Sequence, residues 1–312
     1  MSERCIQGLE AVPDDVRGCV LTIGNFDGVH AGHRHILTTA RDLAAERGKQ
    51  VVALTFEPPP DLVLRPADVP MRIAPPEERC SRLKDAGADW IVTLRTTGDL
   101  LEMPAEAFVD EIVLRRFAPS AMVEGENFFF GRDRQGTVDL LHRAGIDAGF
   151  DVQVVRPITI TLDGEEIRIS STLIRRLVSQ GRVEDAARCL GRHFVLYGRV
   201  VGGHRRGRLI EYPTANLDPA QQITPGDGIY AALADVRGRR FPAAVSIGNN
   251  PTFGPAERTI EAFCLDAEGD FYDERMALSF VARLRDQERF ADASALKARI
   301  ARDVQRVREI CG

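Results

Sequence analysis

Apolar and polar positions in the first half of the chain form short blocks that are typical of strands and helices in turn. Uninterrupted apolar or β-branched runs predict strands at residues 20–23, 51–56, 90–94, 121–123 and 152–160. Apolar residues at helical spacing between these runs predict helices at 36–47, 77–86 and 104–117, the first stopped by Gly48. Because strands and helices alternate, the pattern predicts a parallel sheet with helices on both faces.

The pattern changes near residue 190, after two short predicted helices at 172–180 and 183–190. Short strand-like segments follow, separated by turns at 202–203, 225–228 and 249–251. Residues 275–282 alternate with period two, which predicts a strand with one apolar face. This half is therefore expected to form a small antiparallel barrel. A terminal helix is predicted by five apolar residues at spacings of three and four: Leu296, Ile300, Val304, Val307 and Ile310.

Composition restricts the classes of protein that this chain can belong to. Its 312 residues suit two domains, which we place at 1–188 and 189–312. A net charge of −5 argues against a nucleic-acid partner, so any anion site must be local. No apolar run reaches the roughly 18 residues of a membrane span. The six cysteines form no CxxC pair, which predicts reduced thiols and a cytoplasmic protein. Because no membrane span is predicted, we also expect no membrane partner.

Three of the six histidines lie between residues 30 and 35, where a predicted strand leads into a predicted helix. Glycines there allow the backbone to approach a ligand, and the helix start offers free N–H groups. Two imidazoles spaced H-x-G-H can donate to one phosphate and stabilise charge that develops during nucleotidyl transfer. The alternative is a His-rich surface turn. The candidate residues are Gly24, Asn25, Phe26, Asp27, Gly28, His30 and His33.

A second candidate anion site begins at Ser170. Ser170, Ser171 and Thr172 start a predicted helix, and Arg175 lies one turn after Thr172 on the same side. Hydroxyls and an arginine at a helix start suit a triphosphate, although serines at this place are usually helix caps. The two motifs together are more specific than either one alone.

Taken together, these motifs resemble the nucleotidyltransferase superfamily, and the string GNFDGVHAGHRHIL narrows the resemblance. It is similar to the N-terminal module of bacterial bifunctional riboflavin kinase/FAD synthetases. The resemblance implies a Rossmann-like sheet with His30, His33 and Arg175 as catalytic residues and the flanking glycine loop and serines as the nucleotide site. Residues 123–131 resemble that family's G-x-D-F-x-F-G segment, which implies flavin contacts from Asn127, Phe128 and Phe130; core packing is the alternative for the phenylalanines.

The second half carries the string GRLIEYPTANL, which resembles the riboflavin kinase motif G-R-x-L-G-F-P-T-A-N. The resemblance implies a six-stranded barrel, a nucleotide loop that includes Gly207, Arg208 and Pro213, and Mg²⁺ held by Thr214 and Asn216. It also implies that Glu261 is the general base for the ribityl hydroxyl of the flavin. Without the resemblance, P-T-A-N is a turn and Glu261 is a solvent-facing strand residue.

Four positions depart from the family pattern. Pro59 stands where the family has a histidine, and Glu211 stands where the kinase motif has glycine. A carboxylate at 211 would repel ATP phosphates unless it points outward. Asn127 replaces the usual aspartate, and Leu173 replaces a frequent arginine.

The resemblance implies that the chain phosphorylates riboflavin with ATP to give FMN, then adenylylates FMN to give FAD and pyrophosphate. ATP is the co-substrate, Mg²⁺ is the expected cofactor, and a monomer or weak homo-oligomer is expected. The first alternative is a paralogue with one active half, the kinase being the doubtful one because of Glu211, or with an altered flavin or nucleotide preference. The second is a regulator that binds flavin or nucleotide without turnover.

Overall fold

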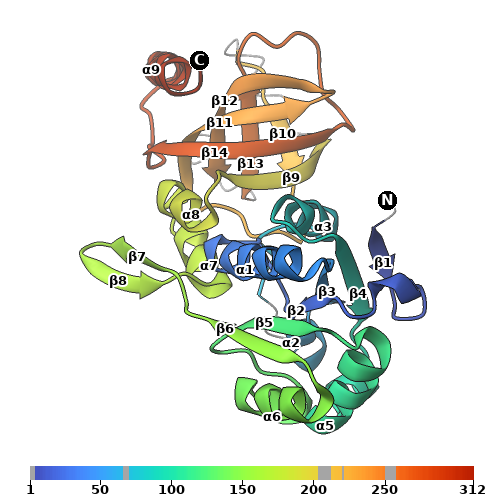
Figure 1. The fold of residues 1–312 in the computed structure, drawn as a ribbon. Helices are drawn as coiled ribbons and strands as arrows, with labels where there is room; N and C mark the ends of the chain where they lie inside the picture. Colours follow the sequence, from blue (N-terminus) through green and yellow to red (C-terminus); the bar gives the residue numbers. More distant parts are fainter. Residues whose placement is uncertain (1–3, 66–69, 203–211, 220, 250–257) are drawn as a thin grey trace. The chain divides into compact units, whose positions relative to one another are not determined.

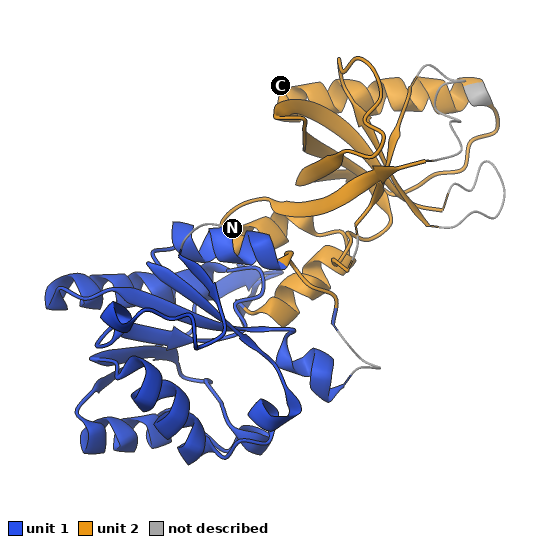
Figure 2. Cartoon of the chain, turned by 90° about the vertical axis from the view of Figure 1, so that its right-hand side faces the viewer, with its two compact units in different colours: residues 1–70, 76–169 blue, residues 71–75, 170–312 orange. Residues whose placement is uncertain are grey.

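The computed structural model describes the chain except for residues 1–3, 66–69, 203–211, 220 and 250–257. The described residues divide into two compact units (Figure 2). The first unit comprises residues 1–70 and 76–169, and the second comprises residues 71–75 and 170–312.

A six-stranded parallel sheet forms the centre of the first unit (Figure 1). Its strands in sheet order are β1 (Cys5–Gln7), β4 (Trp90–Arg95), β3 (Val51–Glu57), β2 (Val20–Ile23), β5 (Ala121–Gly125) and β6 (Asp151–Val155). Each neighbouring pair is parallel. The middle strands are buried on both faces, which explains why the sequence shows them as continuous apolar runs.

Helices cover both faces of this sheet, as the sequence predicts. The helices α1 (Ala31–Arg47) and α3 (Pro76–Asp85) pack on one face. The other face is covered by α5 (Ala105–Phe108), the π-helix η2 (Val109–Phe117) and α6 (Val138–Ala148). Shorter elements are η1 (Asp14–Val16), α2 (Pro60–Leu64), α4 (Gly98–Leu101) and η3 (Arg132–Arg134). The predicted stop of α1 is confirmed, because Gly48 caps it with a φ of 62°.

Two predicted elements differ from the structure. The extended segment predicted at 152–160 divides, and its second part, β7 (Thr159–Leu162), pairs with β8 (Glu165–Arg168) in a separate hairpin. Pro157 lies in the break, where a residue without an N–H cannot continue a ladder. The helix predicted at 104–117 is helical throughout, but most of it has π geometry.

The second unit begins with α7 (Ser171–Ser179) and α8 (Val183–Leu190) and continues into a closed barrel. Around the barrel its strands are β10 (Ala215–Asp218), β13 (Thr259–Cys264), β12 (Arg239–Gly248), β11 (Gly228–Val236), β14 (Arg275–Arg285) and β9 (Phe194–Val201). All neighbouring strands are antiparallel. The terminal helix α9 (Ala293–Cys311) packs Val304, Val307 and Ile310 against the barrel. The predicted fold class is therefore confirmed in both halves.

Candidate active sites

The first candidate site lies beside β2, where the order in which the chain adds strands to the sheet reverses. From β2 the chain continues through β3 to β4 at one side, whereas β5 and β6 lie on the other side of β2. In open parallel sheets, ligands bind outside the carboxyl ends of the strands at such a reversal. The loop from Gly24 to His30 follows β2, and the segment that starts at Glu126 follows β5. The fold thus brings both N-terminal motifs to the same sheet edge.

The loop after β2 has an unusual backbone that its neighbours hold in place. Phe26 and Val29 have φ values of 49° and 41°, in the left-handed region that side chains disfavour. Each such residue costs about 1–3 kcal/mol and persists only where packing enforces it. Both side chains are fully buried. The carbonyl oxygen of Asn25 accepts hydrogen bonds from Thr55 Oγ1 and Arg79 Nη1, each at 3.3 Å.

His30 and His33 stack on one another at the start of α1. Their ring centroids lie 3.6 Å apart with an interplanar angle of 19°. His30 caps the helix, because its Nδ1 accepts from the backbone N–H of His33 at 3.4 Å. A neutral imidazole that accepts at Nδ1 carries its proton at Nε2, so His30 can donate from that atom. Burial, together with the nearby His30, lowers the pKa of His33 well below 6.5, so His33 is neutral at pH 7.

Glycine at position 32 makes the stack of histidines sterically feasible. A Cβ at Gly32 would lie 3.2 Å from Cε1 and Nδ1 of His30. Gly24 has a similar role, since its Cβ would meet the Phe26 ring at 3.2–3.4 Å. The spacing H-x-G-H therefore places the His30 ring next to Gly32, which has no side chain to obstruct it.

The segment after β5 separates into core and surface positions. Phe130 is buried and stacks on the half-buried Phe128, with centroids 5.4 Å apart. Asn127 is exposed. Phe129, which the sequence analysis did not select, is 42% exposed and lies 4.6 Å from the Arg134 guanidinium. Phe130 thus contributes to the core, while the exposed groups of this segment are available to a ligand.

The predicted serine and arginine motif starts α7, in the second unit. Ser170 is the helix cap, and its Oγ accepts from Leu173 N at 3.2 Å. Leu173 is buried, so this departure from the family pattern serves packing. The Arg175 Nε donates to the carbonyl of Met71 at 2.9 Å. Ser171 and Thr172 complete the first turn of the helix.

In the barrel, a carboxylate lies between two hydroxyls. Thr214 Oγ1 donates to one oxygen of Glu261 at 3.4 Å, and Thr259 Oγ1 donates to the other at 3.3 Å. Asn216 is directly opposite Glu261 in the pairing of β10 with β13. A cavity of about 150 Å³ borders Thr214, Asn216 and the exposed Pro213. The fold thus brings together Thr214, Asn216 and Glu261, whereas Gly207, Arg208 and Glu211 lie outside the described residues.

Two family models match the chain, the FAD synthetase model over residues 12–173 and the riboflavin kinase model over residues 190–311. The bifunctional riboflavin kinase/FMN adenylyltransferase of Pseudomonas fluorescens is 36% identical over 98% of this chain and 97% of its own length. This chain belongs to the bifunctional riboflavin kinase/FMN adenylyltransferase family.

Two further proteins are similar to this chain over nearly its full length. The enzyme of the same name from Escherichia coli K12 is 33% identical over 99% of this chain and 97% of its own. A crystal structure described as a macrolide-efflux protein from Streptococcus pneumoniae has a TM-score of 0.87 at 27% identity, covering 98% of this chain and 99% of that one. Over the described residues, no helix of this family member is long and apolar enough to cross a membrane.

Arg79 was not predicted as part of the first candidate site, yet it contacts the loop after β2. It is 4% exposed and lies on the buried face of α3, four residues before Leu83. Besides Asn25, its guanidinium bonds the Phe56 carbonyl at 3.2 Å and the Glu57 carboxylate at 2.9 Å. An arginine at a core-facing helical position is the sequence signal that could have found it. Pro59, the departure from the family pattern two residues after Glu57, occupies the N-cap position of α2 without a side-chain capping hydrogen bond.

Glu124 is a second residue that sequence reasoning missed. It is 1% exposed on β5, and its Oε1 accepts from the backbone N–H of Ile23, the last residue of β2, at 2.8 Å. The β2–β5 pairing ends two residues earlier, at Leu21, so this side chain bridges the strands where they separate. Burial raises the pKa of Glu124 well above 4.5, although the hydrogen bond from Ile23 opposes this. Glu124 therefore keeps its proton to a higher pH in the folded protein than in the unfolded chain.

Changing Glu124 to glutamine is expected to stabilise the first unit at neutral and higher pH. The unfolded carboxyl ionises above about pH 4.5, whereas the folded one ionises only at a higher pH, so wild-type stability falls as pH rises between the two pKa values. Glutamine keeps the acceptor and removes the titration. The difference in unfolding free energy should therefore grow with pH, by at most about 1.4 kcal/mol per pH unit.

Urea unfolding between pH 5 and pH 8, followed by the fluorescence of the single tryptophan, Trp90, measures this difference. Glu126→Gln, at an exposed position two residues later, is the matched control. A difference for Glu124→Gln that stays constant with pH would contradict a raised pKa for this buried carboxyl.

Proposed function

We propose that this chain carries out both reactions of its family. The second half phosphorylates riboflavin with ATP to give FMN, and the first half transfers AMP from ATP to FMN, giving FAD and pyrophosphate. The observation that carries the proposal is that each matched half contains its own organised group of polar side chains. These are the stacked histidines after β2 and the Thr214–Glu261 cluster of the barrel.

In riboflavin phosphorylation, Glu261 acts as the general base. Its carboxylate accepts the proton of the ribityl 5′-hydroxyl as that oxygen attacks the γ-phosphorus of ATP, with ADP as the leaving group. Hydrogen bonds from Thr214 and Thr259 restrict the rotation of this carboxylate. Gly207, Arg208 and Pro213 contribute to the nucleotide loop.

The barrel cluster also offers ligands that suit Mg²⁺. The hydroxyl of Thr214 and the amide oxygen of Asn216 are hard oxygen donors. Thr214 directly precedes β10, and Asn216 is the second residue of that strand. Among the described residues there is no cluster of three His, Cys, Asp or Glu side chains that could hold a metal by itself. Few protein ligands plus phosphates are typical of Mg²⁺ in nucleotide enzymes. When bound, Mg²⁺ would neutralise phosphate charge.

In FMN adenylylation, the FMN phosphate attacks the α-phosphorus of ATP and pyrophosphate leaves. His30 and His33 donate hydrogen bonds to the phosphates, and Arg175 adds a positive charge. The loop residues Gly24, Asn25, Phe26, Asp27 and Gly28 and the helix-start residues Ser170, Ser171 and Thr172 bind the nucleotide. Asn127 and Phe128 contact the flavin, and Phe130 supports Phe128 from the core. No covalent enzyme intermediate is required.

One assay tests both reactions. The pure protein is incubated with riboflavin, ATP and Mg²⁺, and the flavins are separated by chromatography. FAD supports the proposal. FMN alone indicates an inactive transferase half, and unchanged riboflavin indicates either an inactive kinase or a binding protein. Supplying FMN directly tests the second step in isolation, and replacing ATP with CTP or GTP tests the nucleotide preference.

The proposal includes several further points. We place the catalytic domains at 1–188 and 189–312, the enzyme in the cytoplasm, and its state as a monomer or weak homo-oligomer. Its partners are riboflavin, FMN, FAD and ATP, without nucleic acid or membrane. Size-exclusion chromatography with light scattering measures the oligomeric state.

Changing Gly32 to alanine is expected to slow FAD formation from FMN by about 10–100-fold. The new Cβ would lie 3.2 Å from the His30 ring and displace it from His33, and loss of one positioned donor typically costs about that much or more. Steady-state rates of FMN adenylylation measure the effect. Gly98→Ala is the matched control, because nothing lies within 4 Å of a Cβ at Gly98. An unaltered rate for Gly32→Ala would contradict the role of the stack.

A further inference from the structure

The segment that links β14 to α9, residues 286–292, lies close to the barrel site. Gln287 is half-buried, and its Nε2 donates to Ser246 Oγ at 3.4 Å. A Cβ at Gly248 would lie only 2.7 Å from Gln287 Oε1, so the side chain occupies space that this glycine leaves open. The segment therefore packs on the end of β12 through one polar side chain.

That end of β12 presents the same face as the proposed general base. Ser246 is directly opposite Glu261 in the antiparallel pairing of β12 with β13. Side chains of such a pair project to the same face of the sheet, with Cβ atoms about 4.5–5.5 Å apart. The carboxamide of Gln287 thus contacts Ser246, the cross-strand neighbour of Glu261.

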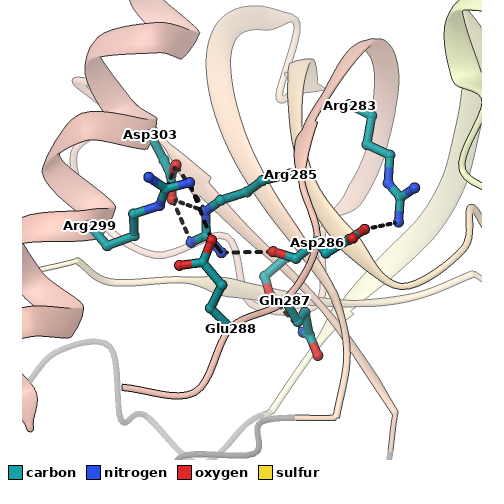
Figure 3. A network of polar contacts seen from close by, with 8 residues as sticks. Arg283, Arg285, Asp286, Gln287, Glu288, Arg299 and Asp303 are labelled. Atoms are coloured by element: carbon teal, nitrogen blue, oxygen red, sulfur yellow. Dashed lines mark hydrogen bonds and ion pairs between the residues drawn. The ribbon is translucent and has the colours of Figure 1, made fainter. Parts of the chain in front are cut away.

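Arg285, the last residue of β14, contacts both α9 and the residue before Gln287. Its Nε donates to both oxygens of Asp303 at 3.1 Å, and its Nη2 donates to Asp303 Oδ2 at 2.7 Å (Figure 3). Its Nη1 donates to the carbonyl of Asp286 at 2.9 Å. Both side chains of the Arg285–Asp303 pair are only 10% exposed. One guanidinium therefore joins α9 to the residue that precedes Gln287.

Neighbouring charges hold the segment on both sides of Gln287. The Asp286 carboxylate pairs with Arg283 at 2.8 Å, and the Glu288 carboxylate pairs with Arg299 of α9 at 3.4 Å (Figure 3). Arg299 also lies 3.8 Å from Asp303. These two pairs are more exposed than the Arg285–Asp303 pair, with side-chain exposures of 32% and 83% for Arg283 and Asp286 and of 26% and 46% for Arg299 and Glu288. The buried contact of this segment is therefore the one made by Arg285.

We propose that Arg285 is a positioning residue for riboflavin phosphorylation, and that the group it positions, the Gln287 carboxamide, orients the hydroxylated ribityl chain toward Glu261. A carboxamide offers one acceptor and two donors, which match the hydroxyls of a polyol. This inference rests on the proposed kinase function of the barrel.

The test compares Arg285→Lys with the same substitution in a different ion pair of α9. Lysine keeps the charge but cannot bind Asp303 and the Asp286 carbonyl with a planar fork. We expect the KM for riboflavin to rise about tenfold while kcat stays within about threefold, since a binding contact with the ribityl chain is weakened and the base remains. Arg308→Lys is the control, because Arg308 of α9 forms an exposed two-point pair with Asp266 at 2.6 and 2.7 Å. Its KM should equal that of the wild type.

Gln287→Ala provides a second variant that leaves the ion pairs intact. Its KM for riboflavin should also rise about tenfold. The double variant Arg285→Lys/Gln287→Ala should show little further increase, because both changes remove the same interaction with the ribityl chain. An unchanged KM for Gln287→Ala would overturn the inference. It would also be overturned if Arg285→Lys lowered both kcat and the melting temperature without changing the KM. Failure of the wild-type protein to form FMN would instead refute the underlying function.

Discussion

Replacing both His30 and His33 with alanine is expected to reduce FAD formation from FMN and ATP by at least about 10³-fold, while riboflavin phosphorylation continues at its normal rate. Removing one preorganised donor typically costs about 10²–10³ in kcat, and the stack supplies two. The loss should appear in kcat, because these donors act on charge that develops in the transition state. Chromatography of flavins in separate assays with riboflavin and with FMN measures both reactions.

His142→Ala is the matched control for this change. His142 is an exposed histidine on α6 in the same unit, so its removal deletes an imidazole without touching the stack. Survival of FAD formation in the His30/His33 double variant would show that the adenylyltransferase site lies elsewhere. A parallel loss of FMN formation would show that the substitutions damage the whole chain.

Replacing Glu261 with alanine is expected to give the opposite result, a loss of FMN formation of about 10²–10⁴-fold with adenylylation of supplied FMN retained. The physical reason is the loss of the group that accepts the hydroxyl proton as the new O–P bond forms. The measurement is kcat for riboflavin phosphorylation at saturating riboflavin and ATP.

Glu261→Gln separates basicity from structure. Glutamine retains the shape and the contacts with Thr214 and Thr259 but cannot accept the proton, so it should lose activity as alanine does. Glu309→Ala, at an exposed position of α9, should behave as the wild type. Substantial activity in Glu261→Gln would refute the role of general base and leave only a supporting role for this residue.

Local patterns in the sequence were sufficient to predict five of the six strands of the parallel sheet, β14 of the barrel and the helices α1, α3, α7, α8 and α9. Continuous apolar runs identified β2 and β3 because these strands are buried on both faces. The apolar spacing of α9 identified its buried side, where Val304, Val307 and Ile310 pack on the barrel.

The β7–β8 hairpin shows where the strand prediction failed. It was missed although Asp163-Gly164 is a typical two-residue hairpin turn, with φ values of 53° and 85°. The β-branched run across Pro157 predicts one continuous strand, and the turn signal at Asp163-Gly164 lies beyond the end of that run. The π-helix was unpredictable for another reason, since a hydrogen-bond shift from i+4 to i+5 hardly changes the apolar pattern.

By itself, the sequence determined the two-domain plan, the family resemblance and the residue types of both candidate sites, because these depend on spacings within about ten residues. Only the tertiary structure decided which side chains meet and in what state. Glu124 bonds a backbone group 101 residues away, Arg79 one 54 residues away, and Thr214 reaches Glu261 across 47 residues. The raised pKa of Glu124, the lowered pKa of His33 and the Arg285–Asp303 pair likewise depend on burial and on neighbouring residues. Desolvation and long-range pairing are properties of the folded chain, and no local pattern encodes them.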